Sequence, residues 1–124
     1  MMSRLQTSED GFTLRVAPAS SPLRGGHVLI ADSNEGSRDR RLSQLRAAGF
    51  RVSVARTGFE AIVKASCQVP DLILIDDALG GVEAAETGRL ITTCPVTAHI
   101  PVIQLSPGPR VPQRVFARMR RLVD

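Results

Sequence analysis

The sequence predicts an α/β domain in which helices cover both faces of a parallel sheet. Short apolar runs alternate with segments of helical periodicity, and three of the runs lead into Asp32, Asp76 or Ser106. Continuous apolar runs are typical of parallel strands, because such strands are buried on both faces. The four predicted strands are Val28–Ala31, Val52–Ala55, Leu72–Ile75 and Pro101–Leu105.

The first predicted helix follows the first strand after a short loop. It runs from Glu35 to Ala48 and ends before Gly49, a residue type common directly after helix C-termini. Its apolar residues share one face, which is expected to pack against the sheet: Leu42, Leu45 and Ala48.

Two more helices complete the alternation of strands and helices. Thr57 stands three residues before Glu60, which is the spacing of a capping box, and the helix that it opens runs to about Gln68. The third predicted helix spans roughly Val82–Thr92 and contains Gly88, which weakens it. Alternation with short loops is the pattern of a parallel sheet covered on both faces.

The charge divides the 124-residue chain, whose net charge is +4, into three parts. Residues 1–26 are rich in Ser, Gly and Pro, so we expect a flexible N-terminal extension. Residues 27–106 carry eight basic and nine acidic side chains and form the predicted domain. Residues 107–124 carry the excess positive charge and predict a basic amphipathic tail, helical over Val111–Leu122.

Composition excludes several classes of protein. No stretch approaches the roughly 18 consecutive apolar residues that a membrane span needs, and the N-terminus lacks the apolar run of a signal peptide. Two cysteines are too few for a disulfide scaffold and lack the spacing of metal ligands. We therefore expect a cytoplasmic protein.

The arginine-rich tail has two interpretations. Four arginines on one helical stripe favour contacts with the phosphates of nucleic acid or of an anionic membrane; they are Arg110, Arg114, Arg118 and Arg121. The alternative is a solvated helix face whose apolar side packs on the domain. We prefer this second interpretation, because Phe116 is the only aromatic residue among the arginines.

The polar residues that follow three strands are expected to meet at one edge of the sheet, where ligands of open parallel sheets bind. Two neighbouring carboxylates destabilise each other unless a cation or a proton lies between them. Asp32 and Asp76 therefore predict a site for Mg²⁺, which prefers oxygen ligands and supports phosphoryl transfer onto a carboxylate. The alternative is that each aspartate caps a helix or faces solvent.

Five short motifs follow one another along the predicted domain: Val28–Asp32, Ala48–Val52, Thr57–Ala61, Pro70–Asp76 and His99–Ile103. In this order and spacing, they resemble the receiver domain of two-component response regulators. The resemblance covers Val28 to Ser106, about two thirds of the chain.

The resemblance implies a flavodoxin-like fold and assigns roles by position. Asp76 matches the residue that accepts the phosphoryl group, and Asp32 matches the first of two acidic residues near the metal. The backbone carbonyl of Ala78 matches the third metal ligand, and Ser106 matches the switch hydroxyl that contacts the phosphoryl group. The implied partners are a sensor kinase or an output protein, and no enzymatic activity is implied.

The sequence also departs from this family. Ser33 stands at the second acidic position, so one carboxylate ligand is missing and Mg²⁺ binding is weakened. The family's lysine after the switch hydroxyl has no counterpart, since the only lysine is Lys64. The fifth strand is missing as well, which leaves Pro101–Leu105 at an edge of the sheet. Phe12–Val16 and the tail helix are two local candidates to cover this edge. We expect that a second copy of the chain, in a homodimer, or a partner protein completes it instead.

Two functions follow from these matches and departures. The preferred one is a pseudo-receiver, a protein-interaction module of a phosphorelay that has lost phosphorylation at Asp76; Ser33 and the missing lysine favour it. The alternative is a stand-alone receiver that is phosphorylated at Asp76 with Mg²⁺. The presence of Asp76 and Ser106 favours this alternative.

Overall fold

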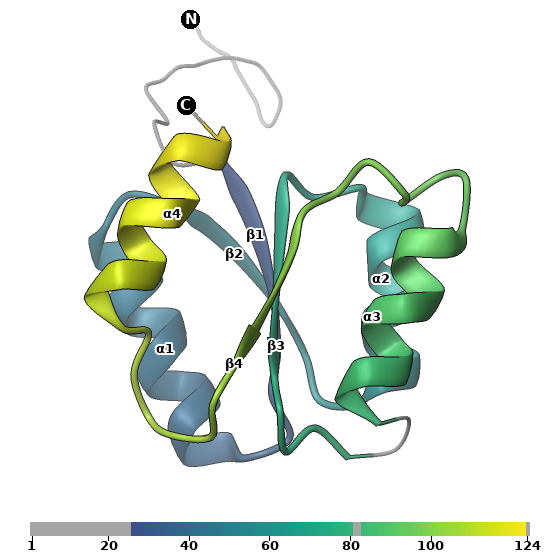
Figure 1. The fold of residues 1–124 in the computed structure, drawn as a ribbon. Helices are drawn as coiled ribbons and strands as arrows, with labels where there is room; N and C mark the ends of the chain where they lie inside the picture. Colours follow the sequence, from purple (N-terminus) through teal and green to yellow (C-terminus); the bar gives the residue numbers. More distant parts are fainter. Residues whose placement is uncertain (1–25, 81–82, 124) are drawn as a thin grey trace, which may run out of the picture.

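The computed structural model describes residues 26–80 and 83–123 of the chain. Within these residues, four parallel strands form one sheet in the order β2-β1-β3-β4, which confirms the predicted fold class (Figure 1). The strands are β1 (His27–Ala31), β2 (Arg51–Ala55), β3 (Leu72–Asp76) and β4 (Val102–Leu105).

Two helices cover each face of the sheet. They are α1 (Glu35–Ala47), α2 (Gly58–Gln68), α3 (Ala84–Thr93) and α4 (Gln113–Val123). Figure 1 shows α1 and α4 on one face and α2 and α3 on the other. The side chains of the sheet therefore pack into two separate layers.

The central strands β1 and β3 supply most of both layers, because their residues are buried on either face of the sheet. Val28 and Ile30 face α1 and α4, whereas Leu29 and Ala31 face α2 and α3. Burying one Val, Leu or Ile side chain contributes roughly 1.5–3 kcal/mol. The apolar runs that predicted the strands are thus the centre of the hydrophobic core.

The side-chain caps at the start of α1 and α2 fix how each helix leaves the sheet. Thr57 Oγ1 accepts a hydrogen bond from the backbone N–H of Glu60 at 3.0 Å, as predicted, whereas the side chain of Glu60 accepts from the backbone N–H of Arg56 at 2.7 Å. At the start of α1, Asn34 Oδ1 accepts a hydrogen bond from the backbone N–H of Ser37 at 2.9 Å. This second cap places the first turn of α1 directly after Asp32.

The buried face of α1 differs from the predicted one. Leu45 is fully buried as expected, but Leu42 and Ala48 are only half-buried. The remaining buried positions belong to Arg38 and Arg41, which are 8% and 0% exposed. The apolar pattern missed these two residues because arginine side chains normally reach solvent.

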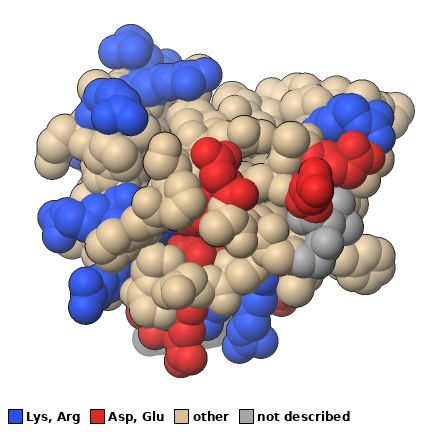
Figure 2. Space-filling view, turned by 60° about the horizontal axis from the view of Figure 1, so that its bottom comes forward, with Lys and Arg blue, Asp and Glu red and all other residues tan. Residues whose placement is uncertain are grey.

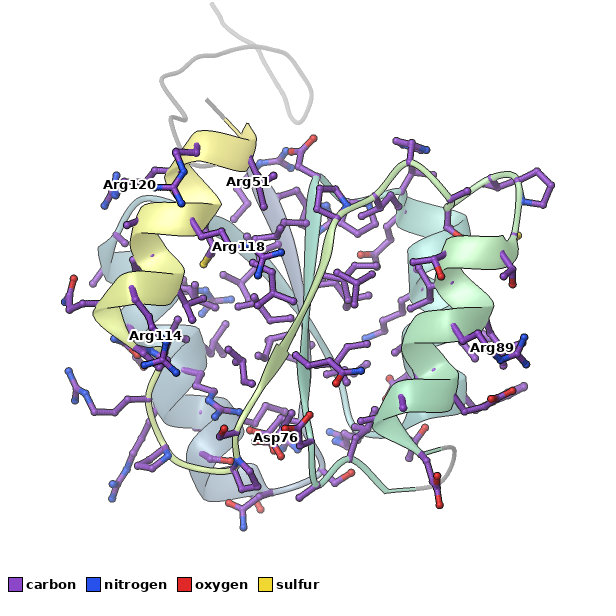
Figure 3. All side chains as sticks on the ribbon, viewed as in Figure 1. Arg51, Asp76, Arg89, Arg114, Arg118 and Arg120 are labelled. Carbon is purple, nitrogen blue, oxygen red and sulfur yellow. The ribbon has the colours of Figure 1, made fainter. Side chains whose placement is uncertain are left out.

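The last helix, α4, packs beside α1 and not over the outer edge of β4 (Figure 1). Its apolar stripe joins the core through Val115, Phe116 and Met119, and the rings of Phe50 and Phe116 lie 6.4 Å apart. Its arginines stay exposed, and Figure 3 shows three of them, Arg114, Arg118 and Arg120.

Strand β4 has a neighbouring strand on one side only in the described part of the chain. Phe12–Val16, one of the candidates to cover the other side, lies outside the described residues. Pairing of this edge with a second copy stays a prediction. No described helix is long and apolar enough to cross a membrane.

Candidate functional site

The carboxyl ends of β1 and β3 bring two aspartates together. Ala31 pairs with Ile75 in the parallel register, so Asp32 and Asp76, the residues that follow this pair, are neighbours across the two strands. Both are almost fully buried, at 1% and 2% exposed. Two buried carboxylates are stable only if hydrogen bonds and opposite charge compensate them.

That opposite charge comes from Arg41 on α1. Its Nη1 lies 2.6 Å from Asp76 Oδ2 and 3.2 Å from Asp32 Oδ2, so one guanidinium bridges both carboxylates. Arg41 itself is 0% exposed. Hydrogen bonds between ionised groups are stronger than neutral ones, and a buried pair is hardly screened by solvent.

The other nitrogens of Arg41 reach the backbone of the segment between β4 and α4. Nη2 donates to the carbonyl of Ser106 at 2.9 Å, and Nε donates to the carbonyl of Arg110 at 3.2 Å. The guanidinium is planar and presents its donors in a fixed fork. Arg41 therefore holds β1, β3 and this segment in one arrangement.

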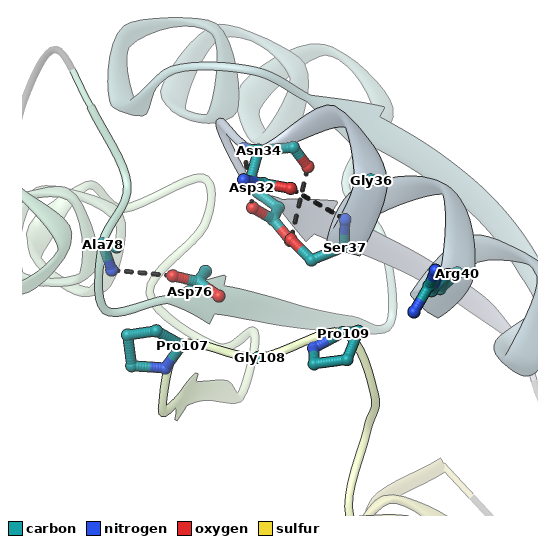
Figure 4. A pocket seen from close by; sticks show the side chains of 10 residues that line it. All are labelled: Asp32, Asn34, Gly36, Ser37, Arg40, Asp76, Ala78, Pro107, Gly108 and Pro109. Atoms are coloured by element: carbon teal, nitrogen blue, oxygen red, sulfur yellow. Dashed lines mark hydrogen bonds between the residues drawn. The ribbon is translucent and has the colours of Figure 1, made fainter.

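The oxygens of the two aspartates have further donors (Figure 4). Asp32 Oδ1 accepts from the backbone N–H of Asn34 at 2.9 Å, and Asp32 Oδ2 accepts from Ser37 Oγ at 2.6 Å. Asp76 Oδ1 accepts from the backbone N–H of Ala78 at 2.7 Å. Together with Arg41, these contacts engage all four carboxylate oxygens.

A pocket of about 370 Å³ opens beside the two aspartates. One wall is the first turn of α1, and the other is the segment from Pro107 to Pro109, as Figure 4 shows. Figure 2 turns this end of the molecule forward, with acidic side chains near its middle and most basic ones along the side of α1 and α4. The pocket therefore opens at one end of the sheet.

Comparison with known proteins identifies the fold. No family model matches the chain. A gliding motility regulatory protein of Myxococcus xanthus is 36% identical over 90 residues, which are 73% of this chain and 11% of that protein. The response regulator PleD of Caulobacter vibrioides is 30% identical over 79 residues, 64% of this chain and 17% of that protein.

Solved structures agree with these relatives. The N-terminal domain of a response regulator receiver protein from Methanoculleus marisnigri JR1 has a TM-score of 0.64 and 26% identity, over 80% of both chains. The signal receiver domain of a histidine kinase from Syntrophus aciditrophicus has a TM-score of 0.70 and 21% identity, over 79% of this chain and 89% of that one. The chain contains a response-regulator receiver domain.

The match to the two curated relatives covers less than a fifth of either protein. The alignments therefore concern a receiver part and not the remainder of those proteins. The predicted family and flavodoxin-like fold are confirmed, whereas the roles assigned to single residues stay predictions.

Asp32 and Asp76, two of the residues predicted for the receiver site, both contact Arg41. Ala78 lies beside them but contacts Asp76 through its N–H. Ser106 contributes its carbonyl to Arg41. Ser33 Oγ turns to other loops, since it donates to the carbonyl of Arg56 and accepts from the N–H of Gly80, both at 2.7 Å.

This donor set does not fit the Mg²⁺ that a receiver domain implies. Mg²⁺ demands near-octahedral oxygen coordination, most often through carboxylates and water. In this domain, Oδ2 of both Asp32 and Asp76 faces a guanidinium, and Ser33 replaces the second acidic residue. The described residues also contain no cluster of three acidic, His or Cys side chains that could hold a metal ion.

Arg41 is the residue that sequence reasoning missed. One signal was available, because Arg41 lies four residues before Leu45 and therefore on the helix face predicted to be buried. An arginine on such a face indicates a buried acidic partner, since unpaired buried charges are very costly. Asp32, at the end of the preceding strand, is the nearest acidic residue in sequence outside the helix that carries Arg41.

Proposed function

We propose that this receiver domain is a protein-interaction module of a two-component pathway that does not depend on phosphorylation of Asp76. One observation carries the proposal: Asp76 is 2% exposed, and its Oδ2 pairs with Arg41 at 2.6 Å. The carboxylate that would attack a phosphodonor is already held by a neighbour in the folded protein.

Phosphorylation of Asp76 would require this arrangement to open. If Oδ2 of Asp76 attacks, it has to lose its contact with Arg41, and if Oδ1 attacks, it has to lose its hydrogen bond from the N–H of Ala78. Breaking a buried ion pair costs several kcal/mol, because the separated charges remain out of water. A metal that could offset this cost has no suitable ligand set at this site, as the orientation of Ser33 illustrates.

The proposal extends to partners and domain organisation. We infer that the receiver-like part, residues 27–106, binds a sensor kinase or an output protein and catalyses no reaction itself. Residues 107–124 complete the domain through α4, whose apolar stripe supports this role. Contact of its exposed arginines with nucleic acid or an anionic membrane stays a prediction.

A functional receiver phosphorylated at Asp76 is the second candidate. The pocket beside Asp76 favours it, because a small phosphodonor would approach the carboxylate from that side. In this case Arg41 would have to move from the carboxylate to the phosphoryl group. The two candidates differ in a single measurable property, the covalent state of Asp76.

The experiment treats the full chain with acetyl phosphate and Mg²⁺ and measures its intact mass. We expect the wild type to show no added phosphoryl mass beyond any that the Asp76→Asn variant also shows. A receiver with both acidic residues and the lysine serves as the positive control for the reagent. A phosphorylated species that disappears in Asp76→Asn would refute the proposal and establish the second candidate.

A further inference from the structure

We propose that Arg41 is the resident cation of the acidic site and excludes divalent cations from it. The inference concerns the same residues as the proposed function and rests on it for their context. It nevertheless makes a separate claim, because a receiver can fail to bind a metal whatever the covalent state of Asp76.

The charges of the buried cluster balance one another. Asp32 and Asp76 contribute two negative charges, and the buried residues Arg38 and Arg41 contribute two positive charges. Arg38 lies next to the site, since its Nη1 donates to the backbone carbonyl of Asp32 at 3.4 Å. A divalent cation between the carboxylates would leave two uncompensated positive charges in a region of low dielectric.

The guanidinium of Arg41 is anchored by several hydrogen bonds at once. A metal ion would need Oδ2 of Asp32 and Asp76, the two atoms that Arg41 contacts. Arg41 cannot simply turn aside, because its other nitrogens donate to the carbonyls of Ser106 and Arg110. Leaving the carboxylates would therefore also break these two part-buried hydrogen bonds.

The position of Arg41 in α1 also suits an apolar side chain. It lies one turn before Leu45, on the stripe that packs against β1 and β3. A Met at this position would have a similar length and would suit an apolar environment, while it would remove the positive charge. Arg41→Met is thus the variant that exposes the carboxylates to another cation with the least steric change.

The experiment measures binding of Mn²⁺ to the full chain by electron paramagnetic resonance. Mn²⁺ is the probe because it takes the same oxygen ligands as Mg²⁺. We expect at least tenfold tighter binding in Arg41→Met than in the wild type, and loss of this gain in Arg41→Met/Asp76→Asn. Arg46→Met is the matched control, since Arg46 is exposed in the last turn of the same helix and does not line the pocket, and it should bind as the wild type does.

Two outcomes would overturn the inference. One is Mn²⁺ binding by the wild type that Asp76→Asn abolishes; the other is folded Arg41→Met that binds Mn²⁺ no better than Arg46→Met. If Arg41→Met fails to fold without a cation, folding on addition of Mn²⁺ supports the inference. If Arg41→Met does not fold at all, Mn²⁺ binding is compared between the wild type and Asp76→Asn. Equal binding by the two supports the inference, and binding that Asp76→Asn abolishes overturns it.

The two proposals can fail independently. A wild-type chain that is phosphorylated at Asp76 but binds no Mn²⁺ would contradict the proposed function and leave Arg41 as the resident cation. A wild-type chain that binds Mn²⁺ at Asp76 but accepts no phosphoryl group would contradict the role of Arg41 as resident cation and leave the proposed function standing.

Discussion

The two faces of the sheet are held together by different forces. On the face of α2 and α3, small and branched apolar side chains such as Ala61, Ala65 and Ile91 pack against the strands. On the face of α1 and α4, the apolar layer gives way near the carboxyl ends of the strands to a buried ionic cluster around Arg41. One face depends on burial of apolar area, and the other depends on charge pairing as well.

This difference predicts how each face responds to substitution. Truncation of an apolar side chain costs its transfer free energy and the cavity that it leaves, and the neighbours stay neutral. Removal of one member of a buried ionic cluster leaves the remaining charges without compensation. The ionic end of α1 should therefore be more sensitive to a single substitution than the opposite face.

The largest expected effect is that of Arg41→Met on stability. In the absence of divalent cations, we expect a loss of about 3–5 kcal/mol in the free energy of unfolding, because Asp32 and Asp76 lose their shared cation. Urea unfolding with EDTA present measures this loss. The control Arg46→Met should change stability by less than about 1 kcal/mol, since Arg46 is exposed in the last turn of α1.

A compensating variant sharpens this result. Replacing Asp32 and Asp76 by Asn in the Arg41→Met background removes the unpaired charges and should restore part of the lost stability. If the triple variant is instead the least stable of the series, side-chain packing and hydrogen bonding outweigh charge at this end of α1, and the proposed contrast between the faces is wrong.

The next effect is that of Ile91→Ala on the opposite face. Ile91 is 1% exposed in the core beneath α3, so we expect a loss of about 2–4 kcal/mol. Unlike Arg41→Met, this variant should unfold at the same urea concentration whether or not Mg²⁺ is present. Ile91→Val is the control, with an expected cost of roughly 0.5–1.5 kcal/mol. A Mg²⁺-dependent recovery of Ile91→Ala would show that cations act on the domain as a whole.

The same contrast explains what the sequence could predict. The apolar runs of β1 and β3 and the cap at Thr57 follow from local rules, and the structure confirms them. The meeting of Asp32 and Asp76 also follows, because parallel strands end at one edge of the sheet. These features depend on periodicity and on residue type at a fixed position.

Arg41 and α4 could not be predicted in the same way. The role of Arg41 depends on partners 9 and 35 residues away, and its residue type normally indicates solvent. Likewise, the apolar stripe of α4 predicts that the helix packs, but periodicity alone does not say against which face. The partners of Arg41 and the face against which α4 packs are both determined by contacts between segments that are distant in sequence.

The smallest expected effect concerns the other end of β1. His27 Nε2 lies 2.7 Å from Ser53 Oγ on β2. Partial burial, and secondarily the positive charge of Arg51, lower the pKa of His27 below its usual 6.5, although Asp71 opposes this shift. The unfolded chain therefore takes up a proton at a higher pH than the folded domain, so the His27 contribution to stability is complete above pH 6.5 and declines as the pH falls through the folded pKa.

A His27→Gln variant tests this polar contact by comparing urea unfolding at about pH 7.5 and about pH 5.5, on either side of the ordinary histidine pKa. The wild type should lose more stability across this interval than His27→Gln, while His99→Gln, at an exposed position, should follow the wild type. The difference should be small beside that of Arg41→Met, because His27 is partly open to solvent and its hydrogen-bond partner is an uncharged hydroxyl. If wild type and His27→Gln lose stability equally, protonation of His27 does not couple to folding, and the ionic cluster at Arg41 is the stronger polar determinant of the sheet.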